Sequence, residues 1–291
     1  MKIPATLILA SAAFAQAQQE GSVRGRSLAS AGGSISGCFS EVSTVQVFGK
    51  GAVEMKNLQV GDEILTAEGS YQSVYAFGHL DKATKGNFIQ IKTDQSVLEV
   101  TAEHLLFVDG KQGAIRADSV RIGDSFEGAS VKSIGSFERS GLYAPFTESG
   151  TLVVDGVKAS SYISLQDTAD NVELQNGFQL MSQHEFVHMM MSPFRMMCMG
   201  VSSELCQSYN ENGMPFFVGY GLQFAEWADT LPVFVQAVLL TAFLFIARGF
   251  MLFEAVFGAS YGPMMMAGAL GTAALLKVSN VRVRANKVKS V

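Results

Sequence analysis

The stretch Gly37-Cys38-Phe39-Ser40 decides how the rest of this chain is interpreted. Small residues at 34, 36 and 37 lead into the cysteine, and an apolar, strand-like run at 42–48 follows it. A cysteine thiolate held against the carbonyl of the preceding residue can cut its own backbone, provided that the leaving amide nitrogen receives a proton. We therefore interpret Cys38 as a nucleophile directed at the Gly37–Cys38 peptide bond.

The residues that follow the cysteine have the pattern of a β domain. Between residues 38 and 166, β-branched and aromatic runs alternate with glycine-containing turns. The runs occupy 42–48, 63–66, 73–77, 88–92, 97–100, 105–108, 131–137 and 151–154. Short strands at this spacing predict an all-β domain rather than alternating strands and helices.

A weak internal repeat lies within this domain. The segment Leu58-Gln-Val-Gly-Asp-Glu-Ile recurs as Val120-Arg-Ile-Gly-Asp-Ser-Phe, and a serine-containing β run follows each copy. A Gly-Asp pair alone is a common turn, but matching apolar flanks favour duplication. The repeat predicts two related β subunits packed about a pseudo-twofold axis.

The segment Thr101-Ala-Glu-His104 offers the assisting groups, directly after the β run at 97–100. Thr101 would hydrogen-bond the amide of the scissile bond, and His104 would protonate the leaving nitrogen. Taken alone, this short pattern also fits an ordinary buried histidine.

Three blocks together resemble the C-terminal autoprocessing domain of hedgehog proteins, the hedgehog branch of the Hint (hedgehog/intein) family. They are Gly37-Cys38-Phe39, the block from Val100 to Val108 and the block from Gly141 to Tyr162, and the resemblance covers about residues 37–195. It implies an all-β Hint fold and a two-step reaction. Cys38 first converts the Gly37–Cys38 bond into a thioester, and a nucleophile, in hedgehogs the hydroxyl of a sterol, then takes the acyl group. Hydrolysis of the thioester by water is the alternative second step.

The resemblance also implies roles for single residues. Cys38 matches the nucleophile, Thr101 and His104 match the pair that promotes the N–S acyl shift, and Asp81 matches the acid that activates the sterol hydroxyl. From the residues alone, Asp81 also fits a charged surface turn. The family's Ala-Ser-Cys-Tyr is Ala-Ser-Ser161-Tyr here, so a second thiol near the site is lost. No cofactor or resident metal is expected, and the expected partner is a sterol or another lipid alcohol.

The composition changes along the chain predict its organisation. We expect a signal peptide at 1–17, followed by a short flexible segment at 18–37 that cleavage releases, and then the Hint domain at 38–166. A helical extension that faces a lipid or sterol would occupy 167–254. A transmembrane helix at 255–276 and a basic tail at 277–291 would complete the chain. The protein would then enter the secretory pathway and be membrane-associated or extracellular. A soluble pair of apolar helices is the alternative for the C-terminal region. With a net charge of −5 and a pI near 5.4, nucleic-acid binding is not expected.

The cysteines and one helix add further expectations. Cys198 and Cys206 are close enough in sequence to pair, which would leave Cys38 free, although three reduced cysteines are also compatible with the sequence. A helix is expected at 183–191, ended by Pro193.

Two other functions remain open. His184-Glu-Phe-Val-His188 satisfies the H-E-x-x-H pattern, in which the two histidines would bind zinc and Glu185 would act as the base of a metallopeptidase. A catalytically inactive Hint fold serving as a membrane-tethered module is the third interpretation.

Overall fold

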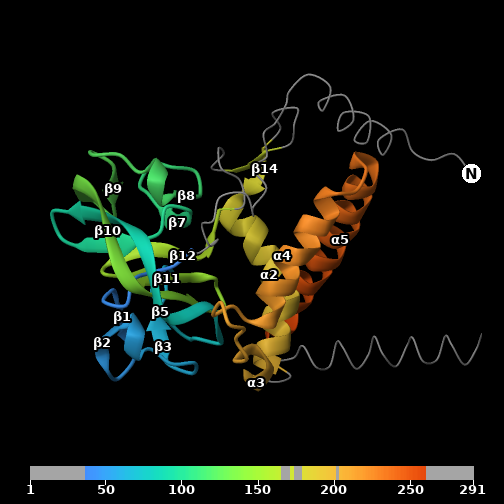
Figure 1. Ribbon diagram of the computed structural model, residues 1–291, viewed down its shortest axis with the longest axis horizontal. Helices are drawn as coiled ribbons and strands as arrows, with labels where there is room; N and C mark the ends of the chain where they lie inside the picture. The colour runs from blue at the N-terminus through green and yellow to red at the C-terminus, as the bar shows by residue number, and fades with distance from the viewer. Residues whose placement is uncertain (1–36, 165–170, 174–178, 201–202, 260–291) are drawn as a thin grey trace, which may run out of the picture.

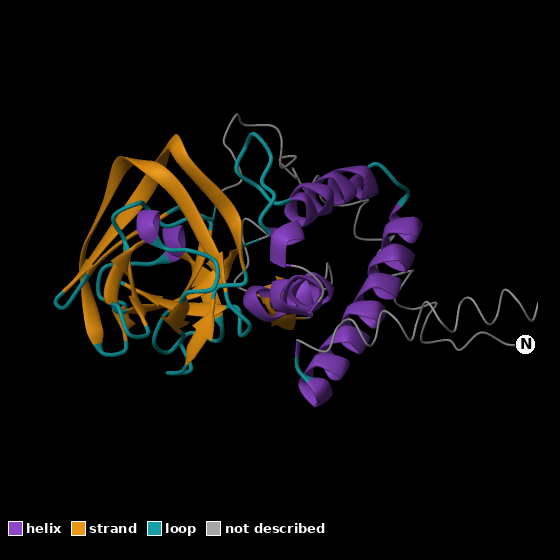
Figure 2. Cartoon of the chain, turned by 90° about the horizontal axis from the view of Figure 1, so that it is seen from below, coloured by secondary structure: helices purple, strands orange, loops and turns teal. Residues whose placement is uncertain are grey.

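The structure is a computed structural model that describes residues 37–164, 171–173, 179–200 and 203–259. A β domain lies beside a group of helices (Figure 1). Seen from below, the sheets of the β domain curve around a common interior, and the helices lie on one side of it (Figure 2). The predicted organisation into an all-β domain with a helical extension is confirmed.

Two sheets build the β domain. The larger contains β1 (Thr44–Val47), β2 (Gly51–Glu54), β3 (Glu63–Leu65), β4 (Tyr71–Ser73), β7 (His104–Phe107), β8 (Ala114–Arg116), β11 (Thr151–Val154) and β12 (Val157–Ile163), in the order β4-β3-β1-β11-β12-β7-β8 with β2 paired to β1. The smaller contains β6 (Val97–Val100), β5 (Ala76–Thr93), β10 (Ala129–Phe146) and β9 (Ser125–Phe126), in that order. Their apolar side chains share one core, which includes Phe39, Val45, Leu98 and Leu106.

The internal repeat is visible in the backbone. A short 3-10 helix precedes each copy, η1 (Met55–Asn57) and η2 (Ala117–Ser119), and the glycine of each copy is left-handed, with φ of 96° at Gly61 and 95° at Gly123. In both copies the aspartate accepts the backbone N–H three residues before it. The two bonds are Gln59 N to Asp62 Oδ2 (3.0 Å) and Arg121 N to Asp124 Oδ2 (2.8 Å). Since β5 and β10, which have 18 residues each, also pair antiparallel, the predicted pseudo-twofold arrangement is confirmed.

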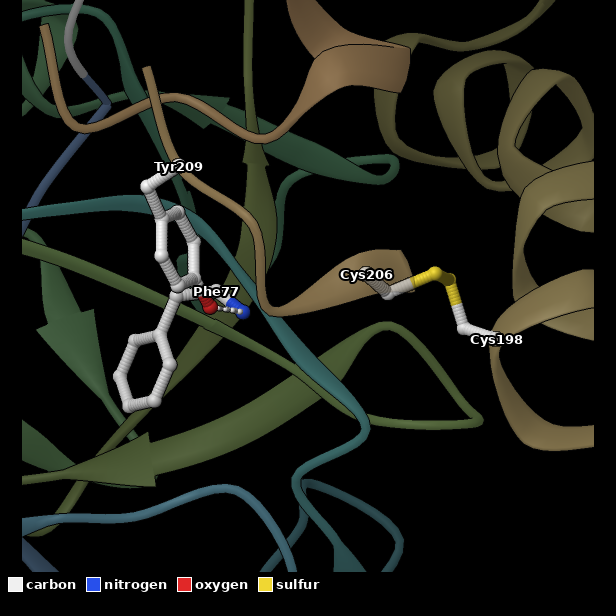
Figure 3. The surroundings of a disulfide bond; sticks show 4 residues. All are labelled: Phe77, Cys198, Cys206 and Tyr209. Carbon is white, nitrogen blue, oxygen red and sulfur yellow. Dashed lines mark hydrogen bonds between the residues drawn. A yellow bond between two sulfur atoms is a disulfide. The ribbon is translucent and has the colours of Figure 1, made fainter. Parts of the chain in front are cut away.

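The helical extension follows a small hairpin of β13 (Asn171–Glu173) and β14 (Gln179–Ser182). It consists of α2 (Gln183–Gly200), α3 (Ser203–Cys206), α4 (Phe216–Asp229) and α5 (Val233–Phe257). A disulfide joins Cys198 of α2 to Cys206 at the end of α3 (Figure 3). The sequence left open this disulfide or three reduced cysteines, and the disulfide leaves Cys38 as the free, buried thiol.

Two predicted helix boundaries are wrong. Pro193 does not end the first helix, because α2 continues to Gly200 with the proline inside it. The turns after the proline are held from outside, by Glu254 on Arg195 and by the disulfide on Cys198. Such tertiary contacts outweigh a local helix-breaking preference.

The predicted transmembrane helix at 255–276 also begins in the wrong place. Residues 255–257 complete α5, and Gly258 ends that helix with φ of 82°. Arg248 and Glu254 both lie within α5, where the charge of Glu254 is paired with Arg195 and Arg248 is exposed. In the part of the chain that the structure describes, one helix, Phe234–Phe257, is long and apolar enough to cross a membrane by length and composition. The predicted signal peptide, residues 260–276 and the basic tail lie outside the described residues, as does the predicted released segment up to residue 36.

Candidate active site

The bond proposed to be cleaved, Gly37–Cys38, lies at the start of the β domain, and its surroundings are tightly packed. Phe39 N–H donates to the carbonyl of Tyr143 (2.8 Å), and Tyr143 N–H donates to the carbonyl of Phe39 (3.2 Å). Cys38 is fully buried and packs with Phe88, Leu142 and Ala144.

Gly37 fits its position because it has no side chain. A Cβ atom added there would lie 1.5 Å from Ile163 Cγ2 and 3.3 Å from His104 Nδ1. Gly37 therefore lies close to both β12 and the imidazole of His104, and a larger residue at position 37 would displace the backbone there.

Thr101 holds the amide between Gly37 and Cys38. Cys38 N–H donates to Thr101 Oγ1 at 3.0 Å, and Thr101 N–H donates to the carbonyl of Cys38, also at 3.0 Å. The threonine follows the end of β6 and is buried, so both bonds are shielded from water. The predicted contact between Thr101 and the scissile amide is present in the structure.

His104 begins β7 and is fully buried. Its Nε2 lies 2.7 Å from the carbonyl oxygen of Ser160. Because a carbonyl can only accept, Nε2 carries the proton of the neutral ring, and Nδ1 is the bare nitrogen. Nδ1 has no partner in hydrogen-bond geometry among the described residues.

The electrostatics of His104 follow from this burial. Desolvation lowers its pKa to about 4, and interactions with the backbone of Ser160 and Gly37 oppose the shift. The ring is therefore neutral at pH 7, and Nδ1 must gain a proton before it can give one away.

Asp81 on β5 belongs to the same site. Its Oδ1 accepts the backbone N–H groups of Ala83 (2.9 Å) and Thr84 (3.0 Å). Hydrogen bonds from Thr84, first from its side chain, and from Ala83 lower the pKa of Asp81, so the carboxylate is ionised at pH 7. Burial raises the pKa of the Cys38 thiol well above its usual value, and the charges of Asp81 and Glu103 raise it further.

The structure also places His79 in the site, which the sequence analysis assigned no role. His79 is buried on β5, and its Nδ1 lies 3.2 Å from Cys38 Sγ. A signal for it was present, because residues two apart in a strand point to the same face, and His79 is two residues before Asp81. The structure therefore brings Cys38, Thr101, His104 and His79 together, and the charge of Asp81 acts on the thiol.

The H-E-x-x-H residues have other partners. Ser182 N–H donates to Glu185 Oε2 (3.0 Å), and Glu185 N–H donates to Ser182 Oγ (3.2 Å), which is a helix-capping box at the start of α2. The Nδ1 atom of each histidine contacts a residue of β12. His184 Nδ1 lies 2.9 Å from Ser160 Oγ, and His188 Nδ1 lies 3.1 Å from the Tyr162 hydroxyl.

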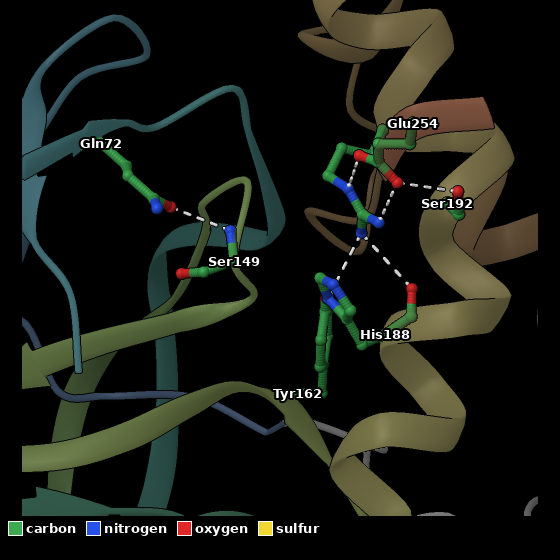
Figure 4. A network of polar contacts seen from close by, with 7 residues as sticks. Gln72, Ser149, Tyr162, His188, Ser192 and Glu254 are labelled. Carbon is green, nitrogen blue, oxygen red and sulfur yellow. Dashed lines mark hydrogen bonds and ion pairs between the residues drawn. The ribbon is translucent and has the colours of Figure 1, made fainter. Parts of the chain in front are cut away.

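A zinc ion at His188 would also have to compete with a positively charged side chain. The guanidinium of Arg195 lies 3.3 Å from the Nδ1 atom of His188, a residue that is labelled in Figure 4. Over the described ranges, no cluster of three or more His, Cys, Asp or Glu side chains is placed to bind a metal ion. The motif is explained by capping and packing, and the metallopeptidase alternative is not favoured.

Comparison with known proteins identifies the family of the chain. The Hint module family matches residues 24–229. The chain is 32% identical over 152 residues to the Tiggy-winkle hedgehog protein of Danio rerio, covering 45% of this chain and 36% of that protein. It is 29% identical over 152 residues to the Sonic hedgehog protein of Xenopus laevis, covering 45% of this chain and 34% of that protein. The chain thus spans about a third of the length of these relatives.

Among solved structures, the chain is similar to the gp41-1 intein, with a TM-score of 0.37 and 17% identity over 43% of this chain and 98% of that one. The family match covers well over half of the sequence and includes the whole β domain. The chain belongs to the Hint family, with a Hint autoprocessing domain of the hedgehog type.

Proposed function

We propose that this protein cleaves its own chain between Gly37 and Cys38 and transfers the N-terminal segment to a nucleophile. The observation that carries the proposal is the hydrogen bond from Cys38 N–H to Thr101 Oγ1, at 3.0 Å. It fixes the amide of one particular peptide bond, at a place where a free thiol and a histidine are also buried.

In the first step, Cys38 Sγ attacks the carbonyl carbon of Gly37. A C–S bond forms, the C–N bond breaks, and the Gly37 acyl group is left as a thioester. The hydroxyl of Thr101 can rotate, so the oxygen that accepts the amide N–H before cleavage can donate to the nitrogen once it becomes pyramidal. Thr101 would thereby hold the leaving nitrogen throughout the step.

His104 would supply the proton that the leaving nitrogen needs. Its Nδ1 is bare and faces the Gly37 side of the bond. Negative charge that develops on the attacked carbonyl favours the protonated imidazole, so the pKa of His104 rises above its resting value of about 4 during the reaction. Nδ1 then gives its proton to the amine of Cys38, and the ring returns to the neutral form.

In the second step, an acceptor takes the acyl group from sulfur. We propose a sterol or another lipid alcohol, with Asp81 as the base that receives the hydroxyl proton. The ionised carboxylate supports this role, and exposed apolar side chains on α5 support a lipid environment. Those more than half exposed on this helix are Phe234, Val238, Phe245, Ile246, Leu252, Val256 and Phe257. Entry into the secretory pathway and association with a membrane are part of the same proposal.

The cleavage is tested by trapping the thioester. Incubating the full chain with dithiothreitol or hydroxylamine should yield a fragment that begins at Cys38 and an N-terminal product that ends at Gly37. Hydroxylamine should leave that glycine as a hydroxamate, whereas a lipid acceptor should leave an ester of the corresponding mass. Mass spectrometry of both products measures this. A stable, uncut chain, or a new terminus elsewhere, would contradict the proposal.

Asp81→Asn should separate the two steps. Removing this charge lowers the thiol pKa, since Asp81 raises it, so cleavage driven by dithiothreitol should be unchanged or faster. Release driven by sterol-containing vesicles should fall by about 10²- to 10⁴-fold, the usual contribution of a general base. The two rates are measured on the same preparation. An equal loss in both would place Asp81 in the first step instead.

A further inference from the structure

The thiol of Cys38 cannot easily lose its proton by itself. Burial is the largest cause that raises its pKa, and the carboxylates of Asp81 and Glu103 add to it. Since the thiolate is the nucleophile, the site needs a base in contact with the sulfur. His104 faces the Gly37 side and is placed to serve the leaving nitrogen.

Among the described side chains, the hydrogen-bond partner of this sulfur is His79. The Sγ–Nδ1 distance is 3.2 Å, and both side chains are buried. Burial is the largest influence on His79 and lowers its pKa, so the ring is neutral at pH 7 and able to accept a proton. The nearby charge of Asp81 and the backbone of Asn212 act in the opposite direction.

The backbone of Asn212 raises the pKa of His79, as a carbonyl near the ring would. With Nδ1 turned to the sulfur, a proton on Nε2 leaves Nδ1 bare beside the thiol. A third group then orients the base, as in other activated nucleophiles.

Asn212 is held in place by a turn, residues 209–215, that binds β5. Leu80 N–H donates to the carbonyl of Gly213 at 2.8 Å, and Phe77 N–H donates to the Tyr209 hydroxyl at 3.3 Å (Figure 3). Inside the turn, Asn210 Oδ1 accepts the N–H groups of Asn212 and Met214, both at 3.0 Å. Gly213 has φ of 71°, and a Cβ there would lie 2.6 Å from the carbonyl oxygen of Leu80. The turn is therefore fitted closely to the strand that carries His79.

We propose that His79 is the general base that takes the proton from Cys38, and that the turn at 209–215 of the helical extension orients it. This inference rests on the proposed function. As Sγ attacks Gly37, its proton passes to Nδ1 of His79, while the leaving nitrogen receives one from His104. His79 afterwards releases a proton to solvent and His104 takes one up, so the proton balance closes.

The test compares wild type with His79→Asn as a function of pH. The asparagine side chain can place an oxygen near the position of Nδ1, so it can accept a hydrogen bond from the thiol but cannot take its proton. Hydroxylamine in excess makes thioester formation the measured step. The ratio of the wild-type rate to the variant rate removes the influence of His104, which both proteins share.

We expect a ratio of about 10²–10⁴ at pH 7, because a general base contributes this much. The ratio should fall by about tenfold for each pH unit towards pH 10, since hydroxide then forms the thiolate without a base. A ratio near one, or a deficit that stays constant with pH, would overturn the role of His79 as a base. Recovery at high pH would also demonstrate that the variant is folded.

His104→Asn is the matched control. It removes a buried histidine from the same site, but its defect should not shrink as the pH rises, because it lacks an acid rather than a base. His79→Gln, read in the same way, replaces the asparagine variant should the latter fail to fold. Failure of the proposed function is distinguishable, because wild type itself would then not be cleaved by hydroxylamine.

Discussion

Replacing Cys38 by alanine is expected to abolish cleavage between Gly37 and Cys38. No other described thiol is free, because Cys198 and Cys206 are joined in a disulfide. Removal of the nucleophile from a covalent mechanism costs on the order of 10⁶-fold in rate, which puts the product below detection. Mass spectrometry after incubation with hydroxylamine measures it.

Cys38→Ser is the control for this variant. The serine keeps nearly the volume of the cysteine among Phe88, Leu142 and Ala144, so the packing of the site is preserved. Its hydroxyl is a much weaker nucleophile at neutral pH, so cleavage should be slow and proceed through an oxygen ester. Cleavage of the alanine variant at the wild-type rate would exclude a reaction through sulfur.

Substitution of Arg195 by methionine is expected to destabilise the helical extension by about 3–5 kcal/mol, the cost of leaving a buried charge without its partner. The guanidinium is 1% exposed and binds both carboxylate oxygens of Glu254 on α5, with Nη2 at 2.6 Å from Oε2. Ser192 Oγ donates to the same carboxylate at 2.9 Å (Figure 4). Urea unfolding of the full chain, followed by the fluorescence of Trp227 on α4, measures the loss.

The double variant Arg195→Met, Glu254→Leu separates the charge from the packing. With both charges removed, no buried carboxylate is left alone, and most of the stability should return, because apolar pairs often replace buried ion pairs without loss. A single variant that unfolds at the wild-type urea concentration would indicate that this ion pair contributes nothing to holding α5 on α2.

Local sequence was sufficient for much of the site. Thr101 and His104 are three residues apart in one turn, so a short motif finds them. The contact of Thr101 with the amide of Cys38 is the one expected, and His104 Nδ1 faces Gly37. The duplicated Gly-Asp segments likewise predicted the symmetry, because each copy forms its own turn through a local aspartate.

Contacts between distant residues were not predictable in the same way. His79 meets Cys38 across 41 positions of sequence, and Tyr209 of the turn at 209–215 meets Phe77 of β5 across 132. The helix boundaries failed for a related reason. Pro193 and Glu254 are unfavourable in an isolated apolar helix. In this fold, Arg195 of α2 binds Glu254 of α5, and this contact joins the two helices. Sequence periodicity contains no information about that pairing.

The backbone bonds of Phe39 have a consequence for the timing of release. The amine freed at Cys38 belongs to the same residue as the acylated sulfur, and the bonds of Phe39 hold that residue in place. A neighbouring amine held in this way attacks with a very high effective concentration, and the severed bond can re-form. In the proposed reaction, the first step is therefore a reversible rearrangement. The N-terminal segment would depart only when an acceptor takes the acyl group, so the acceptor would set the time of release.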